Sequence, residues 1–308
     1  MCSSTRPEGW AASMLGRVTM QTTSTAAQRG MQANAARLAE AQLRANTLQK
    51  NVRLSDDPAA AADSLAVRAA QAQSAQHGRN IDNGNGWLTT ANSALDTSVA
   101  LLQRVQQLTL QGANGAASPQ AKEAIAVELD SIRADLLVQA NTKYLGRTIF
   151  AGNSDAGSAF VDGTPPTFTG APGSTVQRRI SGEASIRVDA DGAAIFGTAA
   201  NSVFELISKV SADLRSGADV SASIGPVNVA LEKVIGQRSE VGARHAELLR
   251  AKDINVSSQV DLESQRASVE DLDLGKAILD LKTQELAYQA SLSVTAKVLS
   301  TTLMDFLR

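Results

Sequence analysis

The chain has few of the residues on which most chemical sites depend. Its 308 residues contain one cysteine and two histidines, and only 3% of them are aromatic. The single cysteine, Cys2, cannot form an intramolecular disulfide, and His77 and His245 are too few and too isolated for a Cys/His metal site. The sequence also contains no phosphate-binding loop and no nucleophile elbow. We therefore predict no catalytic residues, no bound metal and no cofactor, and we expect that the protein is not an enzyme.

Two other absences limit the choice of partners. No stretch approaches the ~20 consecutive apolar residues that span a membrane. The 29 lysines and arginines nearly balance the 31 aspartates and glutamates, so the chain lacks the basic surplus typical of nucleic-acid binding. We expect neither membrane insertion nor a nucleic-acid partner. The first 30 residues also lack the apolar core of a secretory signal, so an exported chain would leave by another route.

The sequence does contain heptad patterns at both ends of the chain. Positions alternately four and three residues apart form one seam from Met20 to Val52 and a second from Leu274 to Phe306. Half of the N-terminal positions are Ala, Ser or Asn, so this seam buries little apolar area and should be weak in an isolated chain. We expect the two termini to pair. The seam residues proposed for assembly are Met31, Leu38, Leu48, Leu281, Tyr288, Leu292, Leu299 and Phe306.

Two adjacent carboxylates stand before a proline in the stretch "RLSDDPAAA". As a pair, Asp56 and Asp57 could suggest acid–base chemistry, but no histidine or metal-ligand cluster stands near them. A residue before proline leaves the helical region, as an N-cap residue does, and proline is well suited to the first helical position. The pattern therefore predicts that Asp57 caps a helix that starts at Pro58.

Helical patterns continue through the centre of the chain, with one change of character. We predict a helix from Pro58 to about residue 75, which loosens in "HGRNIDNGNG" and resumes at residues 87–109. The loosened stretch is either a kink or a polar helical patch. Ser118 and Ser202 are predicted N-caps of later helices. Between them, short β-prone pieces are broken by Gly, Pro and Asp: "RTIFAG", "PPTFTG", "TVQRRI", "ASIRVDADG" and "AAIFG".

These patterns predict a mainly α fold. The N- and C-terminal regions should form a long helical bundle or coiled coil, with a small β-rich insert in the middle. The expected order is an unstructured extension or mis-assigned start (1–13), an N-terminal helix segment (14–57), a helical arm (58–147), the β-rich insert (148–200), a second helical arm (201–269) and a C-terminal helix segment (270–308).

Several of these stretches resemble the bacterial flagellin-like axial proteins. Residues 101–152, from "LLQRVQQLTLQGANGAASPQ" to "YLGRTIFAG", look like the helical arm of that family nearly throughout. Together with "RLSDDPAAA", "SEVGARHAEL" and the ending "ELAYQASLSVTAKVLSTTLMDFLR", they are most similar to the hook-associated protein 3 group. Flagellins proper usually end in an Ala-Asn and Pro-Gln pattern, which is absent here.

The resemblance implies a structural protein of the flagellum that forms the junction between hook and filament and serves as a template for flagellin. It further implies four partners: other copies of the chain, the preceding hook-associated protein, flagellin, and an export chaperone at the C-terminal helix. Secretion would follow the flagellar type III route. A short flagellin is the alternative within the family, and a soluble signalling coiled coil is an alternative outside it.

Overall fold

A computed structural model describes residues 20–50, 55, 57–115 and 117–306. The predicted extension at residues 1–13 lies outside this part of the chain. The described residues are 74% helical, with a small insert of short antiparallel strand pairs, so the predicted fold class is confirmed. By their internal contacts, the described residues up to 69 and from 262 onward belong to one compact unit, which we call the terminal unit, and those within 70–261 form the other, the central unit.

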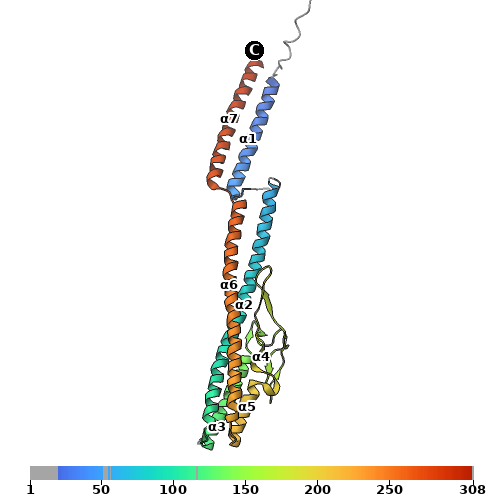
Figure 1. Cartoon of the computed structure of the whole chain (residues 1–308). Coiled ribbons are helices and arrows are strands. Elements are labelled where there is room, and N and C mark those ends of the chain that lie inside the picture. Colours follow the sequence, from blue (N-terminus) through green and yellow to red (C-terminus); the bar gives the residue numbers. More distant parts are fainter. Residues whose placement is uncertain (1–19, 51–54, 56, 116, 307–308) are drawn as a thin grey trace, which may run out of the picture. The chain divides into compact units, whose positions relative to one another are not determined.

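Seven α-helices carry most of the described chain (Figure 1). They are α1 (Met20–Thr47), α2 (Pro58–Gly112), α3 (Pro119–Ala140), α4 (Gly192–Phe196), α5 (Val203–Ser216), α6 (Ile224–Glu270) and α7 (Leu274–Phe306). Two short 3₁₀ turns, η1 (Ala199–Asn201) and η2 (Ser221–Ser223), lie on either side of α5.

The insert between α3 and α5 consists of three antiparallel hairpins rather than one sheet. The paired strands are β1 (Lys143–Tyr144) with β2 (Arg147–Thr148), β3 (Phe160–Val161) with β4 (Thr167–Phe168), and β5 (Gln177–Arg179) with β6 (Ser185–Arg187). Two-stranded hairpins are marginal by themselves. The insert is instead held by a cluster of aromatic rings that includes Phe160 and Phe204, whose centroids lie 5.2 Å apart.

The core of the central unit combines this aromatic cluster with an aliphatic stripe on its helices. Leu88, Leu95 and Leu102 follow one face of α2 at seven-residue spacing and are completely or almost completely buried. Leu129 and Leu136 of α3 repeat the spacing and are fully buried. A seven-residue repeat keeps apolar side chains on one side of a helix, which explains why these helices pack along their lengths.

The stretch "HGRNIDNGNG" is a polar helical patch rather than a kink, because α2 runs through it without interruption. The polar residues of this stretch are contact residues rather than loop residues. Asn83 accepts a hydrogen bond from Arg178 Nε (2.8 Å), and Asn80 donates one to the carbonyl oxygen of Arg179 (2.9 Å). On another side of the helix, Asn85 lies 2.8 Å from His245 Nε2. Tertiary hydrogen bonds thus offset the low helix propensity of Asn.

The glycines of the same stretch make room for close neighbours. A Cβ on Gly84 would lie 3.1 Å from a methyl group of Val188, and a Cβ on Gly86 would collide with the ring of Tyr144. The Tyr144 ring lies edge-to-face against buried Trp87, with centroids 6.0 Å apart. Packing against the insert therefore explains why glycines occur within this polar helical patch.

A correction concerns "AAIFG", which forms α4 rather than a strand. Asp191 lies in an extended conformation just before it and accepts hydrogen bonds from the amides of Ala193 (3.0 Å) and Ala194 (3.2 Å). These bonds satisfy amides at the start of a helix. Ile195 and Phe196 then turn into the core together.

The predicted caps of α3 and α5 are present. Ser118 Oγ accepts from the Ala121 amide, and Ser202 Oγ accepts from the Glu205 amide, both at 3.2 Å. The second capping box lacks its reciprocal half, because the Ser202 amide donates to the Ala199 carbonyl oxygen (3.1 Å) instead of to Glu205.

Candidate functional site

The terminal unit is built around the pairing of α1 with α7 (Figure 1). The N-terminal seam faces this contact: Met31, Asn34 and Leu38 are half-buried, and Ala41 is buried. On α7, Leu281 and Tyr288 are half-buried and Thr295 is buried. The predicted partnership of the two ends of the chain is therefore confirmed.

This contact buries very little. Among the described residues of the terminal unit, only Ala41 and Thr295 fall into the buried class. A methyl group and a threonine contribute much less hydrophobic free energy than the ~1.5–3 kcal/mol of one fully buried leucine. Two helices of 28 and 33 residues thus lack a core of their own. Such a pair is suited to packing against further helices.

Two predicted seam positions, Leu48 and Leu292, are exposed rather than packed in this contact. Leu48 lies just after the end of α1, with a positive φ of 55°, and is 53% exposed. Leu292 lies at the edge of the contact and is 42% exposed. A strict seven-residue repeat drifts around a straight helix of 3.6 residues per turn, which moves distant positions away from the seam. The side chains of Leu299 and Phe306 lie outside the described part of the structure.

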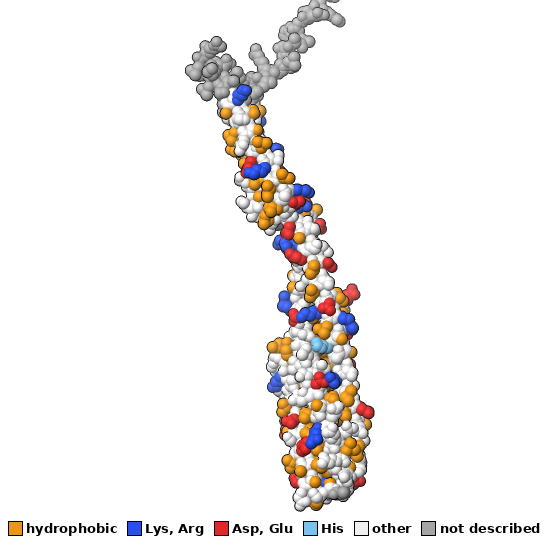
Figure 2. All heavy atoms as spheres, turned by 90° about the vertical axis from the view of Figure 1, so that its left-hand side faces the viewer, with side chains coloured by type: hydrophobic (Ala, Val, Ile, Leu, Met, Phe, Trp, Pro, Cys, Tyr) orange, Lys and Arg blue, Asp and Glu red, His pale blue; other side chains and the backbone are white. Residues whose placement is uncertain are grey.

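A second apolar stripe on α7 was not predicted. Leu279, Leu286 and Val294 are 70%, 68% and 58% exposed, and at 100° per residue they lie opposite Leu281 and Tyr288. We call these three residues the outer stripe. The face of the terminal helices turned to the viewer in Figure 2 shows hydrophobic side chains among charged ones. The seven-residue spacing of Leu279 and Leu286 is the sequence signal that could have revealed it.

The two linkers of the terminal unit pair with each other. The Leu272 amide donates to the Leu48 carbonyl oxygen (3.1 Å), and the Lys50 amide donates to the Glu270 carbonyl oxygen (2.9 Å). Gln49 and Asp271 form an antiparallel bridge between these bonds. The segments that leave α1 and α6 are therefore joined by backbone hydrogen bonds.

The carboxylate of Glu270 links this linker pair to α2. It accepts hydrogen bonds from Arg68 Nε (2.7 Å) and Nη2 (2.9 Å), from Ser64 Oγ and from Arg266 Nη1 (3.1 Å). The bonds from Arg68 and Ser64 lower the pKa of Glu270 to about 2. We call these four residues the Glu270 cluster. Sequence reasoning missed it because Ser64 and Arg68 are far from Glu270 along the chain.

The predicted cap of α2 lies in the same unit. Asp57 Oδ1 accepts from the Ala60 amide at 3.0 Å, and Pro58 is the first residue of the helix. These are the positions predicted for an N-cap carboxylate and an N1 proline. The neighbouring Asp56 lies outside the described residues.

Among the described residues, no group of three or more His, Cys, Asp or Glu side chains could hold a metal ion. No described helix is both long enough and apolar enough to cross a bilayer. His245 contacts Asn85, while both ring nitrogens of His77 are buried without a hydrogen-bond partner in the described chain.

Comparison with known proteins agrees with this architecture. Residues 18–155 match the family model for the bacterial flagellin N-terminal helical region. The chain is 24% identical over 263 residues to flagellar hook-associated protein 3 of Salmonella typhimurium, covering 77% of this chain and 82% of the relative. The chain is similar to the flagellin-like proteins of the bacterial flagellum. The proteins that it resembles are structural flagellar proteins rather than members of a known enzyme family.

Two further matches show the breadth of this flagellin-like group. The flagellar filament 31.3 kDa core protein of Treponema maltophilum is 22% identical over 253 residues, covering 81% of this chain and 84% of the relative. The structure of a putative flagellar hook-associated protein from Vibrio parahaemolyticus matches with a TM-score of 0.65 and 21% identity, covering 70% of this chain and 100% of the other. The structural match shows a shared fold.

Proposed function

We propose that this flagellin-like protein forms the junction between hook and filament and serves as a template for flagellin. The observation that carries the proposal is the terminal unit, in which two long paired helices bury only Ala41 and Thr295 among their described residues. Such helices gain their packing from neighbours, as subunits of an axial assembly would provide. The name hook-associated protein 3 of the Salmonella relative supports the junction over other positions in the flagellum.

A filament subunit is the second candidate, supported by the match to a Treponema filament core protein. Deletion of the gene from the bacterium that encodes it separates the two roles. A junction protein predicts cells that keep their hooks, lack filaments and release flagellin into the medium, as seen by electron microscopy and blotting. Retained filaments with one filament type missing would instead indicate a flagellin. Re-expression of the unaltered chain is the control.

The proposed partners are other copies of the chain, the preceding hook-associated protein and flagellin. The export route proposed is flagellar type III secretion, with a chaperone on the C-terminal helix. The outer stripe supports the chaperone proposal, because its apolar side chains could enter a groove without separating α1 from α7. Replacing both Leu279 and Leu286 by aspartate should abolish binding in a pull-down, since carboxylates are costly in an apolar groove.

A matched control replaces exposed Leu249 and Ile254 of α6 by aspartate, which adds the same charge away from α7. This control should leave chaperone capture unchanged. Equal capture of the Leu279/Leu286 variant and the wild-type chain would place the chaperone site elsewhere.

A further inference from the structure

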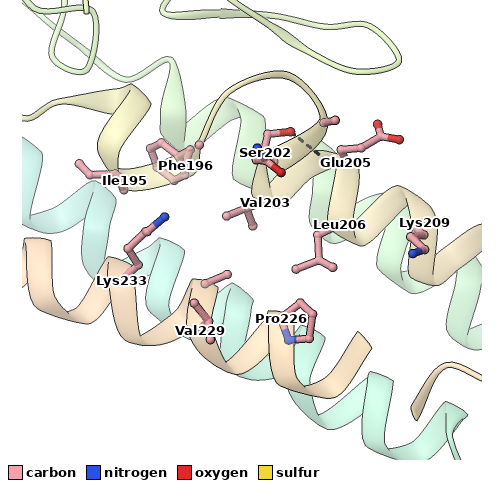
Figure 3. A pocket seen from close by; sticks show the side chains of 14 residues that line it. Ile195, Phe196, Ser202, Val203, Glu205, Leu206, Lys209, Pro226, Val229 and Lys233 are labelled. Atoms are coloured by element: carbon pink, nitrogen blue, oxygen red, sulfur yellow. Dashed lines mark hydrogen bonds between the residues drawn. The ribbon is translucent and has the colours of Figure 1, made fainter. Parts of the chain in front are cut away.

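A hollow of about 320 Å³ lies between α5 and α6 in the central unit (Figure 3). The apolar part of its wall includes Val203 and Leu206 of α5 and Val229 and Ala230 of α6. Val229 is 60% exposed, so part of this wall is open to solvent. At one end the wall continues with Ile195 and Phe196 of α4.

Two lysines give the hollow a positive rim. Lys209 and Lys233 line opposite sides of it in Figure 3, and neither makes an ion pair with any residue that the structure describes. The carboxylate of Glu205 also belongs to the lining but points away from the hollow in this view. We call Val203, Leu206, Lys209, Val229, Ala230 and Lys233 the α5–α6 groove. An apolar floor between unpaired cations favours an apolar segment that carries carboxylates.

The chain itself presents such a segment on α6. Val256 and Val260 are 51% and 65% exposed, although nothing in the described chain covers them. Asp253 and Asp261 lie on the same side of the helix, are exposed, and make no ion pair within the described chain. At 1.5 Å per residue these carboxylates are about 12 Å apart along the axis. We call these four residues the α6 strip.

Groove and strip cannot meet within one molecule. Both involve the same continuous helix, the groove near residue 230 and the strip near residue 257. The rise of an α-helix puts about 40 Å between them. Contact between them therefore requires two copies of the chain, one contributing its groove and the other its strip. Heterologous contacts of this kind repeat from copy to copy and produce a closed ring or a helical array.

We propose that the α6 strip of one copy docks in the α5–α6 groove of the next, with Asp253 and Asp261 facing Lys209 and Lys233. The second copy is favoured as the occupant because its charge pattern complements that of the groove. This inference rests on the proposed axial role, in which copies of the chain are brought together. The inference specifies which surfaces of the central unit meet. It also implies that neighbouring copies are displaced from each other along the axis of α6.

Disulfide cross-linking in isolated flagella tests the contact. The full-length chain carries Cys2→Ser, Val229→Cys and Val256→Cys, and mild oxidation is followed by non-reducing electrophoresis. A groove–strip contact predicts a ladder of dimers, trimers and larger species. Each single-cysteine variant should stay monomeric, because a heterologous contact does not bring a position against its own copy. A control with Val229→Cys and Val138→Cys, an exposed position on α3, should give no ladder.

Charge reversal provides a second, independent test. Lys209→Glu with Lys233→Glu should abolish the ladder, and adding Asp253→Lys with Asp261→Lys in the same chain should restore it. A variant with Lys122→Glu and Lys143→Glu changes the net charge equally outside the groove and should cross-link normally. Restoration by the second pair would exclude simple misfolding as the cause of the loss.

Three results would overturn the inference: no ladder in the double-cysteine chain, an undiminished ladder after reversal of both lysines, or cross-linking of Val229→Cys only to a different flagellar protein. None of these results would alter the deletion phenotype on which the junction proposal depends. Conversely, the double-cysteine chain could form a ladder while deletion of the gene leaves the junction intact. That combination would support the groove–strip contact and exclude the junction role.

Discussion

At the scale of single residues, the sequence was informative where an interaction is local. The caps by Asp57, Ser118 and Ser202 each join a side chain to an amide three residues ahead. A reader of the sequence needs only the local pattern to predict them. The Glu270 cluster could not be predicted in this way, because its partners meet only after α2 and α6 have packed.

Substitutions at Asp57 test whether this carboxylate acts as a cap. Asp57→Ala removes the acceptor for the Ala60 amide and should cost about 1 kcal/mol at the start of α2. Asp57→Asn keeps an acceptor and should be nearly silent. Amide hydrogen exchange at Ala60 measures the difference, with about fivefold faster exchange expected for the alanine variant, as about 1 kcal/mol implies. Equal exchange in the two variants would contradict a capping role.

The Glu270 cluster predicts a specific pH dependence. Hydrogen bonds from Arg68 and Ser64 hold the pKa of Glu270 at about 2, below its ordinary 4.5. A depressed carboxyl pKa stabilises the folded linkers above pH 4.5, and that stabilisation is lost as pH falls from about 4.5 toward 2. Exchange protection of the Lys50 and Leu272 amides should decrease over that window.

Glu270→Gln is the control for this prediction, because it keeps the shape of the side chain but cannot titrate. Its linker amides should be less protected near neutral pH and should show no loss specific to the acidic window. The same acid-induced loss in both proteins would show that another group is responsible.

At the scale of elements, helices with a clear apolar period were the predictable part of the fold. The helical arms predicted at 58–147 and 201–269 contain α3 and α6. The polar patch of α2 depends on distant neighbours, because Asn83 is satisfied by Arg178 of β5, a contact that local propensity does not show. The error at "AAIFG" had a local signal, because Asp191 caps α4 from the position just before the helix.

Two glycines with different surroundings test this dependence on neighbours. Gly197 ends α4 with a φ of 74°, and a Cβ there would lie 2.3 Å from the Asn201 carbonyl oxygen. Gly197→Ala should therefore destabilise the central unit by about 2–4 kcal/mol, through backbone strain and collision. Gly236→Ala in α6 meets nothing within 4 Å and should stabilise it by about 0.5–1 kcal/mol. Urea unfolding monitored by circular dichroism should give shifts of opposite sign.

At the scale of the whole molecule, burial is divided unequally between the two units. Apart from Ala41, all apolar side chains in the buried class of the described chain belong to residues 70–261. The order of helices and insert could be predicted from the sequence, because composition and period change at their boundaries. The sparse burial in the terminal unit agrees with the Ala, Ser and Asn of the N-terminal seam, from which a weak seam was predicted. The docking surfaces of the central unit could not be foreseen, because exposure is a property of the folded chain.

This inequality predicts that the isolated monomer unfolds in two steps. Fixing one residue of backbone costs about 1–2 kcal/mol, which the sparse contact between α1 and α7 does not offset. The terminal unit should open first, so that amides of α1 and α7 exchange fast while those around Leu95 and Leu129 remain protected. Limited proteolysis should remove both ends together and leave the central unit, residues 70–261, which keeps its calorimetric transition. Flagella provide the matched comparison, because packing against neighbouring copies should protect the same termini. Slow exchange of α7 in the free monomer, equal to that of α2, would show that the helix pair is stable without neighbours.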